Sequence, residues 1–467
     1  MNFTIKTIGC KVNTYESTKI KDELIKLGFN YIDVEDKESY KDLDFYIVNT
    51  CSVTSIADKK SRQMLHLAKK YNPNVRVIAI GCMVDSLSVN INANEGASHK
   101  LDGVDYLIPN CKKDTLSDFL LSLSNTVGAN ANTVGDDILS SHVDANSRIR
   151  AFIKIQDGCN QYCTYCIIPY LRGNIKSRDN DDIVKEVREK AKSGVKEIVL
   201  TGIHLSSFGL DRVGKSYESE GAIEIARNSL LEIMNQIAEI EGIERIRLGS
   251  LEPRIIDVNF LLQLAEDTAS PLNPVGANTD IVGANTDIVG ANTDIVGANA
   301  CGALSRKFCA NFCLSLQSGC DKTLKRMNRH YTTADYEKAC DLIRKYLPNA
   351  TITTDVIVGF PGEMEEDFEE SLEFVKKMRF YNPNIFPYSI RQGTKAAEMD
   401  NQLSNAEKHR RAKIMIEECE KISKEIQEEY NKTEHEVLIE EKVVEDGIEY
   451  GIGYTMEYIK KKVKIST

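Results

Sequence analysis

Three cysteines fall within the eight-residue segment CNQYCTYC, at residues 159–166. A [4Fe–4S] cluster normally takes four cysteine ligands, so a cluster held by Cys159, Cys163 and Cys166 would keep one iron open. An open metal position can bind a small molecule, as it does at catalytic zinc. The spacing therefore predicts a cluster that acts as a reagent. Zinc or a chance grouping are the alternatives, because the chain has 13 cysteines, but the residues between these three are poor fourth ligands for zinc.

A second set of cysteines follows three strand-like runs near the N-terminus. Cys10 follows FTIKTIG, Cys51 follows DFYIVNT, and Cys82 follows VRVIAIG. Ligands of open parallel sheets bind beyond the carboxyl ends of the strands, so we expect these three thiols at one edge of one sheet. They predict a second cluster with an open iron. Buried structural thiols are the alternative, since free cysteine is among the most buried residue types.

The composition is that of a multidomain globular protein. The chain has 467 residues, of which 42% are hydrophobic and 28% charged, so two or three domains are expected. We find no signal peptide and no apolar stretch of the roughly 18–20 residues that a membrane helix needs, which predicts a cytoplasmic protein with no membrane contact. Cysteines in such a protein point to metal or redox chemistry rather than disulfides. The net charge of −11 argues against extensive nucleic-acid wrapping but allows a local basic face.

Alternating strand-like and helix-like segments predict an α/β protein. Residues 1–121 are expected to form a flavodoxin-like domain that carries the N-terminal set of cysteines. Residues 122–148, rich in Asn, Ser, Gly and Ala, are expected to be a linker. From residue 149 to 431, six further strand-like runs with helices between them predict an incomplete (β/α)6 barrel, whose chemistry lies at the C-terminal ends of its strands. The CNQYCTYC segment follows the first of these runs, AFIKIQ.

Three smaller features complete the predicted organisation. Residues 402–431 have the apolar spacing of a charged amphipathic helix. Residues 432–467 alternate like short antiparallel strands and predict a small OB-like β domain, which could hold an oligonucleotide or only pack against the core. Residues 269–304, which include three VGANTDI repeats, are expected to be a disordered insertion without chemistry of its own. A heptad coiled coil is the alternative, but three Gly-containing copies could not bury a core.

The sequence around these cysteines resembles the radical S-adenosylmethionine (SAM) methylthiotransferases. The CNQYCTYC segment matches the C-x3-C-x2-C signature of radical-SAM enzymes, with IKIQDG before it and IIPYLRG after it. The other matching motifs cover most of the chain and are GCKVNTYES (9–17), NTCSVTSIADKKSRQ (49–63), Gly81-Cys82, EIVLTGIHLSSFG (197–209), LSLQSG (314–319), LKRMNR (324–329), TTDVIVGFPGE (353–363), FPYSIRQGT (386–394) and GYTMEYI (453–459). The last motif resembles the family's C-terminal TRAM domain, here shortened by several strands.

The resemblance implies a reaction and its cofactors. GCKVNTYES and LTGIHLSSFG look most like the branch that methylthiolates N6-threonylcarbamoyladenosine in tRNA. The family's pattern implies that the cysteines of residues 159–166 hold a SAM-binding [4Fe–4S] cluster, and that Cys10, Cys51 and Cys82 hold an auxiliary [4Fe–4S] cluster that carries the sulfur. One SAM would give a 5′-deoxyadenosyl radical that removes hydrogen from adenine C2, and a second SAM would supply the methyl group. The implied partners are the anticodon stem-loop of tRNA and a small electron-donor protein.

The family's remaining SAM contacts carry over to strand-end and turn residues. Tyr165 would lie near the adenine, and Gly359 belongs to a turn in which the family's backbone approaches the adenine. The other candidates end strand-like runs and would reach the amino group, ribose or carboxylate of SAM: Thr201, Gly202, Glu252, Ser315 and Gln317. Each of them could equally be an ordinary strand-terminal or turn residue.

The chain departs from the family pattern near the insertion. Asn311 and Cys313 replace the histidines that usually precede LSLQSG, and GCMVD replaces a GCYAQ-like run after the third N-terminal cysteine. The crowded cysteines of this region match no site spacing and are predicted not to be ligands: Cys301, Cys309, Cys313 and Cys320. Two other functions stay open. One is methylthiolation of N6-isopentenyladenosine in tRNA or of a ribosomal-protein aspartate, and the other is a non-catalytic iron–sulfur protein that binds RNA.

Overall fold

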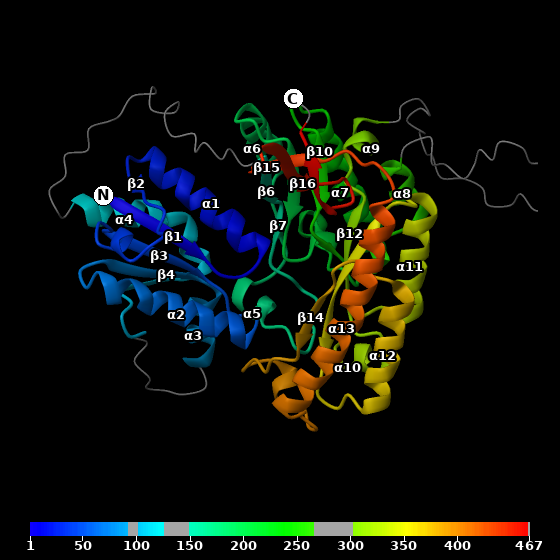
Figure 1. The fold of residues 1–467 in the computed structure, drawn as a ribbon. Coiled ribbons are helices and arrows are strands. Elements are labelled where there is room, and N and C mark those ends of the chain that lie inside the picture. Colours follow the sequence, from blue (N-terminus) through cyan, green and yellow to red (C-terminus); the bar gives the residue numbers. More distant parts are fainter. Residues whose placement is uncertain (92–100, 126–148, 266–301, 466–467) are drawn as a thin grey trace, which may run out of the picture.

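The computed structural model describes residues 1–91, 101–125, 149–265 and 302–465. It contains an N-terminal parallel sheet, a larger parallel barrel and a small C-terminal antiparallel sheet (Figure 1). The N-terminal sheet lies beside the barrel, with the short helix α5 (Ile168–Arg172) between them. The predicted α/β class is confirmed.

Five parallel strands form the N-terminal sheet in the order β2-β1-β3-β4-β5. This is the flavodoxin-like order, as predicted. The strands are β1 (Asn2–Thr7), β2 (Asn30–Tyr31), β3 (Phe45–Thr50), β4 (Arg76–Gly81) and β5 (Tyr106–Ile108). The helices are α1 (Lys11–Lys26), α2 (Ser55–Tyr71), α3 (Cys82–Ile91) and α4 (Leu116–Asn125).

Alternation along β3 gives this sheet two apolar cores. Phe45 and Ile47 pack on the side that α1 and α4 cover, whereas Tyr46 and Val48 pack on the side of α2 and α3. A central strand with both faces covered is apolar throughout, and every residue of β3 is buried. Because β1 lies between β2 and β3, the direction of chain progression switches between β1 and β3, where open sheets bind their ligands.

The core is an open barrel of parallel strands, arranged as β10-β9-β6 and β11-β12-β13-β14. An isolated bridge between Ile246 and Phe308 joins the two groups. The strands are β6 (Arg150–Lys154), β9 (Glu197–Thr201), β10 (Arg245–Leu248), β11 (Ser250–Leu251), β12 (Asn311–Gln317), β13 (Thr351–Val358) and β14 (Asn384–Pro387). All six predicted runs form strands, and the third is divided into β10 and β11.

Helices cover the outside of the barrel and bury its apolar strands. They are α6 (Asn180–Lys192), α7 (Ala222–Ala238), α8 (Val258–Leu264), α9 (Ala303–Lys307), α10 (Asp321–Arg326), α11 (Thr333–Tyr346), α12 (Glu365–Met378) and α13 (Asn405–Tyr430). α13 is the amphipathic helix predicted at residues 402–431, and the Ser404 side chain caps it by accepting from the Glu407 amide. None of the helices in the described ranges combines the length and apolar character needed to cross a membrane.

Two predicted irregular segments meet helices at their ends. α4 continues to Asn125, so the first residues of the linker expected at 122–148 are helical, and residues 126–148 lie outside the described residues. The insertion expected at 269–304 lies outside them as far as residue 301, and α9 begins at Ala303. The end of α4 therefore lies beyond the predicted start of the linker, and the start of α9 lies before the predicted end of the insertion. Both predicted boundaries are corrected accordingly.

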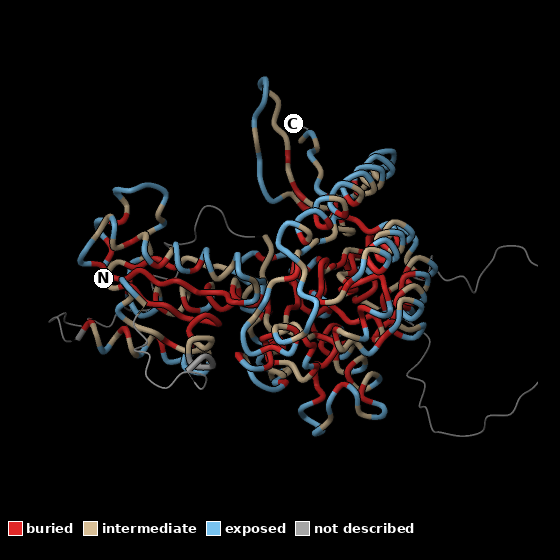
Figure 2. The backbone as a smooth tube through the Cα atoms, turned by 90° about the horizontal axis from the view of Figure 1, so that it is seen from below, coloured by how far each residue is buried: buried red, intermediate tan, exposed pale blue. Residues whose placement is uncertain are grey.

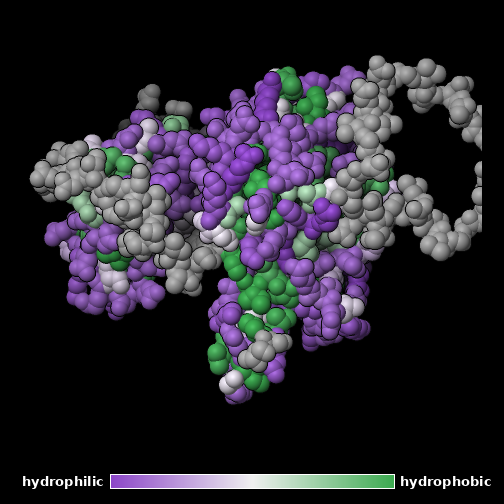
Figure 3. Space-filling model, turned by 90° about the horizontal axis from the view of Figure 1, so that it is seen from above, coloured by the Kyte–Doolittle hydropathy of each residue, from purple (hydrophilic) through white to green (hydrophobic). Residues whose placement is uncertain are grey.

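The C-terminal residues form an antiparallel sheet of β15 (Leu438–Glu445), β16 (Ile448–Tyr454) and β17 (Lys460–Lys464). This is the predicted small β domain, although the strands described up to residue 465 form an open sheet rather than a closed barrel. The sheet packs at the amino ends of the barrel strands, where Arg245 Nη1 donates to the Tyr454 carbonyl at 2.7 Å. Its β15–β16 hairpin projects from the body (Figure 2), and apolar side chains gather along it (Figure 3).

Candidate functional site

Three adjacent strands bring the N-terminal cysteines to one sheet edge. Cys10 is the N-cap of α1 after β1, Cys51 follows β3, and Cys82 is the first residue of α3 after β4. Gly9 permits this approach, since a Cβ there would lie 2.8 Å from Cβ and 3.0 Å from Sγ of Cys51. Its φ of +116° is also one that other residues rarely adopt. The predicted common edge is therefore present.

The thiols of this N-terminal trio act on one another. Burial raises the pKa of Cys51 to about 11, and the neighbouring thiols of Cys82 and Cys10 add to the increase. Asn110 Nδ2 donates to Cys82 Sγ at 3.7 Å. Cys10 is exposed whereas Cys51 and Cys82 are buried, so the trio forms a site that opens to solvent on one side.

The barrel trio consists of Cys159, Cys163 and Cys166 and lies in the loop that follows β6 and the short strand β7 (Gln156–Asp157). Strand β7 pairs with β8 (Lys176–Ser177). The Cys166 amide donates to the Cys163 carbonyl at 2.9 Å, which curls the loop. Burial raises the pKa of Cys159 to about 11, and the Cys163 thiol adds to it. Burial also raises the pKa of Cys166, with contributions from both other thiols. These three sulfurs are therefore neighbours at the carboxyl end of the barrel.

An arginine that the sequence analysis did not assign to either cysteine site contacts this trio. Arg329 Nη1 donates to Cys163 Sγ at 3.2 Å, and its Nε donates to the Tyr331 hydroxyl at 3.1 Å. The Tyr331 hydroxyl in turn donates to the Leu316 carbonyl at 2.8 Å, which ties it to β12. Arg329 is therefore tied both to the trio and, through Tyr331, to β12. The LKRMNR motif contains Arg329, but nothing in the motif indicates that its partner is a cysteine 166 residues away.

Tyr165 lies beside this trio, and Gly359 packs against α13. The Tyr165 ring packs edge-on to Phe360, with 6.5 Å between ring centres. Burial raises the pKa of Tyr165, and the Cys163 thiol adds to it, so the ring borders the sulfurs. Gly359 has a φ of +71°, and a Cβ there would lie 2.6 Å from Cγ of Lys408 on α13. Packing against Lys408 is thus one structural reason for a glycine at this position.

Thr201 ends β9, and Gly202 follows it against the cysteine loop. A Cβ on Gly202 would lie 2.9 Å from Oε1 of Gln156. Gln156 Nε2 donates to the Gly158 carbonyl at 2.7 Å, and its Oε1 accepts from the His204 amide at 2.8 Å. Gln156 therefore fastens the end of β9 to the loop that begins the barrel trio. The IKIQDG motif contains it, but the partners of its amide come from the fold.

Glu252 is almost fully buried, at 2% exposure. Its Oε2 accepts from the Tyr217 hydroxyl at 2.6 Å and its Oε1 accepts from Arg254 Nε at 2.7 Å. These two donors fix the carboxylate at the end of β11. A second lone pair on each oxygen stays available for a further donor.

Ser315 and Gln317 lie on β12 at a register shift. The pairing with β13 skips a residue between them, and Gln317 has a φ of +69°. Bulges and left-handed non-glycine residues are enriched beside active sites. Of the other cysteines nearby, Cys313 Sγ is 3.2 Å from the Ser250 hydroxyl, and the Cys309 amide bonds to the Ile246 carbonyl. Cys301 lies outside the described residues.

A buried ion cluster joins the N-terminal domain to the barrel between the two trios. Glu16 of α1 accepts from Lys113 Nζ at 2.6 Å, from Arg172 Nη1 at 2.9 Å and from Lys154 Nζ at 3.0 Å. Arg172 Nη1 also pairs with Asp157, two residues before the barrel trio, at 3.0 Å. Burial alone would raise the pKa of Glu16, but Arg172, Lys113 and Lys154 hold this pKa well below its usual range. The cluster therefore sets the relative position of the two cysteine sites.

Replacing the Glu16 carboxylate should destabilise the interface between the two domains. Glu16→Gln removes the carboxylate that two buried cations, Lys113 and Arg172, share with the half-buried Lys154. Breaking a buried pair costs about 3–5 kcal/mol. Because the folded-state pKa is depressed, the contribution of Glu16 is complete above the ordinary glutamate pKa and lost as the pH falls through the folded value. The difference in the free energy of urea unfolding between Glu16→Gln and wild type should therefore become smaller in acid.

Glu38→Gln is the matched control for this prediction. Its carboxylate pairs with Lys41 on the surface, where both side chains are mostly exposed, and such pairs contribute little. Equal unfolding midpoints for the two variants at neutral pH would contradict the role given to Glu16.

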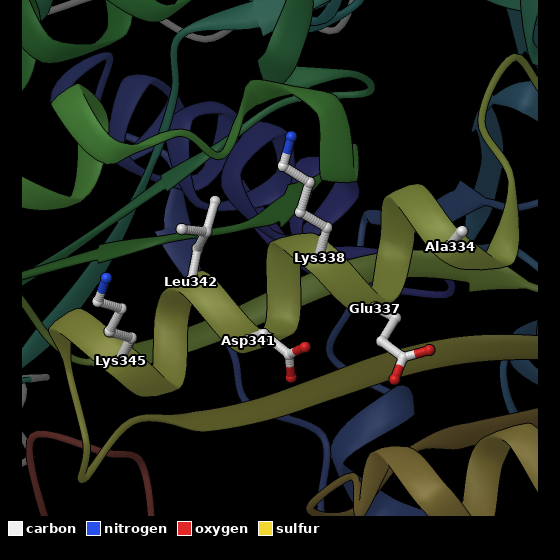
Figure 4. Close-up of a pocket in the computed structure, with 6 residues that line it drawn as sticks. All are labelled: Ala334, Glu337, Lys338, Asp341, Leu342 and Lys345. Atoms are coloured by element: carbon white, nitrogen blue, oxygen red, sulfur yellow. The ribbon is translucent and has the colours of Figure 1, made fainter. Parts of the chain in front are cut away.

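One surface hollow and the search for single-ion sites can be compared with the cysteine sites. Within the described ranges, no three His, Cys, Asp or Glu side chains converge on the volume of one metal ion. That finding concerns single ions, whereas a [4Fe–4S] cluster spreads its cysteines over separate iron corners. A hollow of about 350 Å³ is lined by side chains of α11 alone, among them Glu337, Lys338 and Asp341 (Figure 4). None of the six cysteines of the trios lines it.

Family models match both halves of this arrangement. Residues 2–101 match the model described as "Uncharacterized protein family UPF0004", and residues 153–209 and 215–375 match that of the radical SAM superfamily. A threonylcarbamoyladenosine tRNA methylthiotransferase, MtaB, of Aquifex aeolicus is 32% identical over 446 residues, which cover 94% of this chain and 93% of the relative. The chain belongs to the radical-SAM methylthiotransferase family. The family implies a [4Fe–4S] cluster and SAM as cofactors.

Relatives with two different named substrates are about equally similar. The tRNA-2-methylthio-N(6)-dimethylallyladenosine synthase of Clostridium tetani is 33% identical over 437 residues, which cover 91% of this chain and 83% of the relative. Among solved structures, the radical SAM methyltransferase TsrM of Kitasatospora setae has a TM-score of 0.52 at 13% identity and covers 85% of this chain and 77% of its own. This likeness concerns the fold.

The residues present fit an iron–sulfur cofactor. All six cysteines of the two trios are free thiols, and soft thiolate donors in groups of three are suited to iron–sulfur clusters. In the barrel trio, Arg329 already donates to Cys163, and the Gln161 amide lies 3.5 Å from Cys159 Sγ as a second donor to sulfur. The sulfur atoms of a bound cluster accept hydrogen bonds from donors of this kind.

Proposed function

We propose that this methylthiotransferase acts on tRNA and converts N6-threonylcarbamoyladenosine to its 2-methylthio derivative. The observation that carries the proposal is the pair of three-cysteine sites, one at the sheet edge and one at the barrel mouth, linked through the buried cluster around Glu16. Insertion of sulfur at an unreactive carbon needs both a radical generator and a sulfur carrier, and each site has the donor set for one of them. The named activity of the Aquifex relative supports the choice of substrate.

In this proposal, the barrel trio holds the SAM-binding [4Fe–4S] cluster and the N-terminal trio holds an auxiliary [4Fe–4S] cluster. When bound, the two clusters would supply reductive cleavage of SAM and the sulfur atom, and a second SAM would supply the methyl group. A small protein would donate the electron. The protein's part is to hold these reactants in position.

The chain's own residues divide the binding of SAM among them. Tyr165 borders the barrel trio and offers a ring for the adenine, whereas Thr201 and Gly202 bring the backbone of β9 close to the cysteine loop. The available lone pairs of Glu252 suit the ribose hydroxyls or the ammonium of SAM. Ser315 and Gln317 present the irregular end of β12, and Gly359 keeps the next turn close to α13.

The substrate is tested by offering two modified RNAs to the holoenzyme. Anticodon stem-loops that carry N6-threonylcarbamoyladenosine or N6-isopentenyladenosine are incubated with reduced enzyme and SAM, and the nucleosides are analysed by mass spectrometry. The proposal expects the 2-methylthio product from the first RNA. The second candidate function is methylthiolation of N6-isopentenyladenosine, which the similarity to the Clostridium synthase supports. Product from the isopentenyl RNA alone would establish this function in place of the proposed one. A protein that cleaves no SAM would instead be a non-catalytic iron–sulfur protein.

A further inference from the structure

The inner face of the barrel carries side chains at the ends of β13 and β14 that have no role in the binding of SAM or of the clusters. Side chains alternate along a strand, and Val356, Val358 and Ile385 belong to the core beneath the outer helices or pack against it. The residues that alternate with them therefore face the barrel interior, where parallel barrels carry out their chemistry at the strand ends. They are Asp355, Ile357, Asn384 and Phe386.

A hydrogen bond between the two strands fixes the Asp355 carboxylate on this face. Asp355 is paired in register with Asn384, and Asn384 Nδ2 donates to Asp355 Oδ1 at 3.0 Å. Among the described residues, no donor is bonded to the other oxygen, Oδ2. Burial raises the pKa of Asp355, whereas the bond from Asn384 favours the charged form. Asp355 therefore offers an acceptor of fixed position to a ligand in the barrel.

Phe386 presents an exposed ring beside this carboxylate. It lies on the same face of β14 as Asn384, about 6–7 Å further along the strand, and 39% of it is exposed. A nucleobase can stack on an exposed aromatic ring of this kind. The carboxylate and the ring together suit the hydrogen-bonding edge and the flat face of a purine.

The ends of β13 and β14 contact the segments of both cysteine sites. Phe360, which follows β13, packs edge-on against Tyr165 of the barrel trio's loop, with 6.5 Å between ring centres. Ser389, which follows β14, accepts from the Ser55 amide at 2.9 Å, and Ser55 lies shortly after Cys51 in the chain. Figure 1 shows β14 on the side of the barrel toward the N-terminal domain. A base held on this face would therefore lie between the radical generator and the sulfur carrier.

We propose that the inner face of β13 and β14 binds the target adenine of the RNA, with its ring stacked on Phe386 and its N6–H donated to Asp355. The proposal rests on the proposed function and deepens it, because it names the residues that hold the reacting base. An adenine with one substituent on N6 keeps one N6–H, which needs an acceptor once water is excluded. A threonylcarbamoyl group adds a second N–H, and a carboxylate has lone pairs for both.

The hydrogen bond is tested with two anticodon stem-loops and holoenzyme that carries both clusters. One RNA contains N6-threonylcarbamoyladenosine, and the other contains the same nucleoside with a methyl group in place of the N6 hydrogen. Wild type should bind the first RNA at least about tenfold more tightly, as measured by fluorescence anisotropy, since a charge-assisted hydrogen bond is lost in the second. Asp355→Asn should show no such preference, because Asn384 holds its amide oxygen and its NH2 faces the base. Asp114→Asn, at a carboxylate 94% exposed, is the control and should keep the preference.

The stacking contact is tested with Phe386→Leu, which keeps an apolar side chain and removes the ring. This variant should bind the threonylcarbamoyl stem-loop about tenfold more weakly than wild type, since base stacking contributes about 1–3 kcal/mol. It should bind a stem-loop with an abasic site at the target position as wild type does. Leu262→Ala is the matched control, because Leu262 of α8 is exposed to a similar extent, 38%, on the outside of the barrel, and it should leave both affinities unchanged.

Each outcome decides the proposal. Equal affinity of wild type for the two modified RNAs would overturn it, as would the same preference in Asp355→Asn as in wild type. A loss of SAM affinity in Asp355→Asn without RNA would assign the carboxylate to SAM and overturn it too. Should Asp355→Asn fail to retain its clusters, Phe386→Leu carries the test, and wild-type affinity for the threonylcarbamoyl RNA in that variant overturns the proposal. A wild-type holoenzyme that forms no methylthio product on this RNA contradicts the proposed function instead, which separates the two failures.

Discussion

Cys163→Ala is expected to abolish the formation of 5′-deoxyadenosine from SAM, down to the level of iron-free protein. Cys163 is the buried member of the barrel trio and the one to which Arg329 donates. With two cysteines left, the site lacks the three thiolates that a cluster with one open iron requires. The measurement is 5′-deoxyadenosine release from anaerobically reconstituted, chemically reduced protein.

Cys111→Ala is the matched control for this loss. Cys111 is an exposed free cysteine outside both trios, and its replacement should leave SAM cleavage unchanged. Retained 5′-deoxyadenosine production by Cys163→Ala, at the rate of this control, would refute the role of the barrel trio.

Cys51→Ala should separate SAM cleavage from product formation. Cys51 belongs to the other trio and leaves all three cysteines of the barrel trio in place, so 5′-deoxyadenosine formation should stay within about twofold of wild type. The 2-methylthio nucleoside should disappear, because the sulfur-carrying site has lost a ligand. Both quantities come from one reaction mixture, with mass spectrometry of the digested RNA beside the assay of 5′-deoxyadenosine. Methylthio product at the wild-type level would show that the N-terminal trio is not the source of sulfur.

Sequence patterns were sufficient to predict the elements and the two groups of cysteines. Strands with both faces buried read as continuous apolar runs, so DFYIVNT and EIVLTG identified β3 and β9 directly. Cysteines immediately after such runs must lie at the carboxyl edge of the sheet. Local sequence patterns were therefore enough to place Cys10, Cys51 and Cys82 at one edge, although they do not tell which strands pair.

The residues around the cysteines could not be predicted in the same way, because their partners are distant in the chain. Arg329 bonds to Cys163 across 166 residues, and Glu16 pairs with Arg172 across 156 residues. Each arginine lies in a motif that was noted, yet a motif does not state which atom accepts the hydrogen bond. At Gly359 the sequence predicted a glycine that lets a ligand approach, whereas the structure shows that the same glycine makes room for the Lys408 side chain.

The iron and sulfide content of anaerobically reconstituted protein tests the account most directly. Two clusters on two cysteine trios predict about eight iron and eight sulfide per wild-type chain, and about four of each when either trio is changed to alanine. The remaining four should respond spectroscopically to SAM only when the barrel trio is intact. About four iron atoms per wild-type chain, or zinc instead of iron, would contradict the central claim that the chain holds two clusters, each with an open iron.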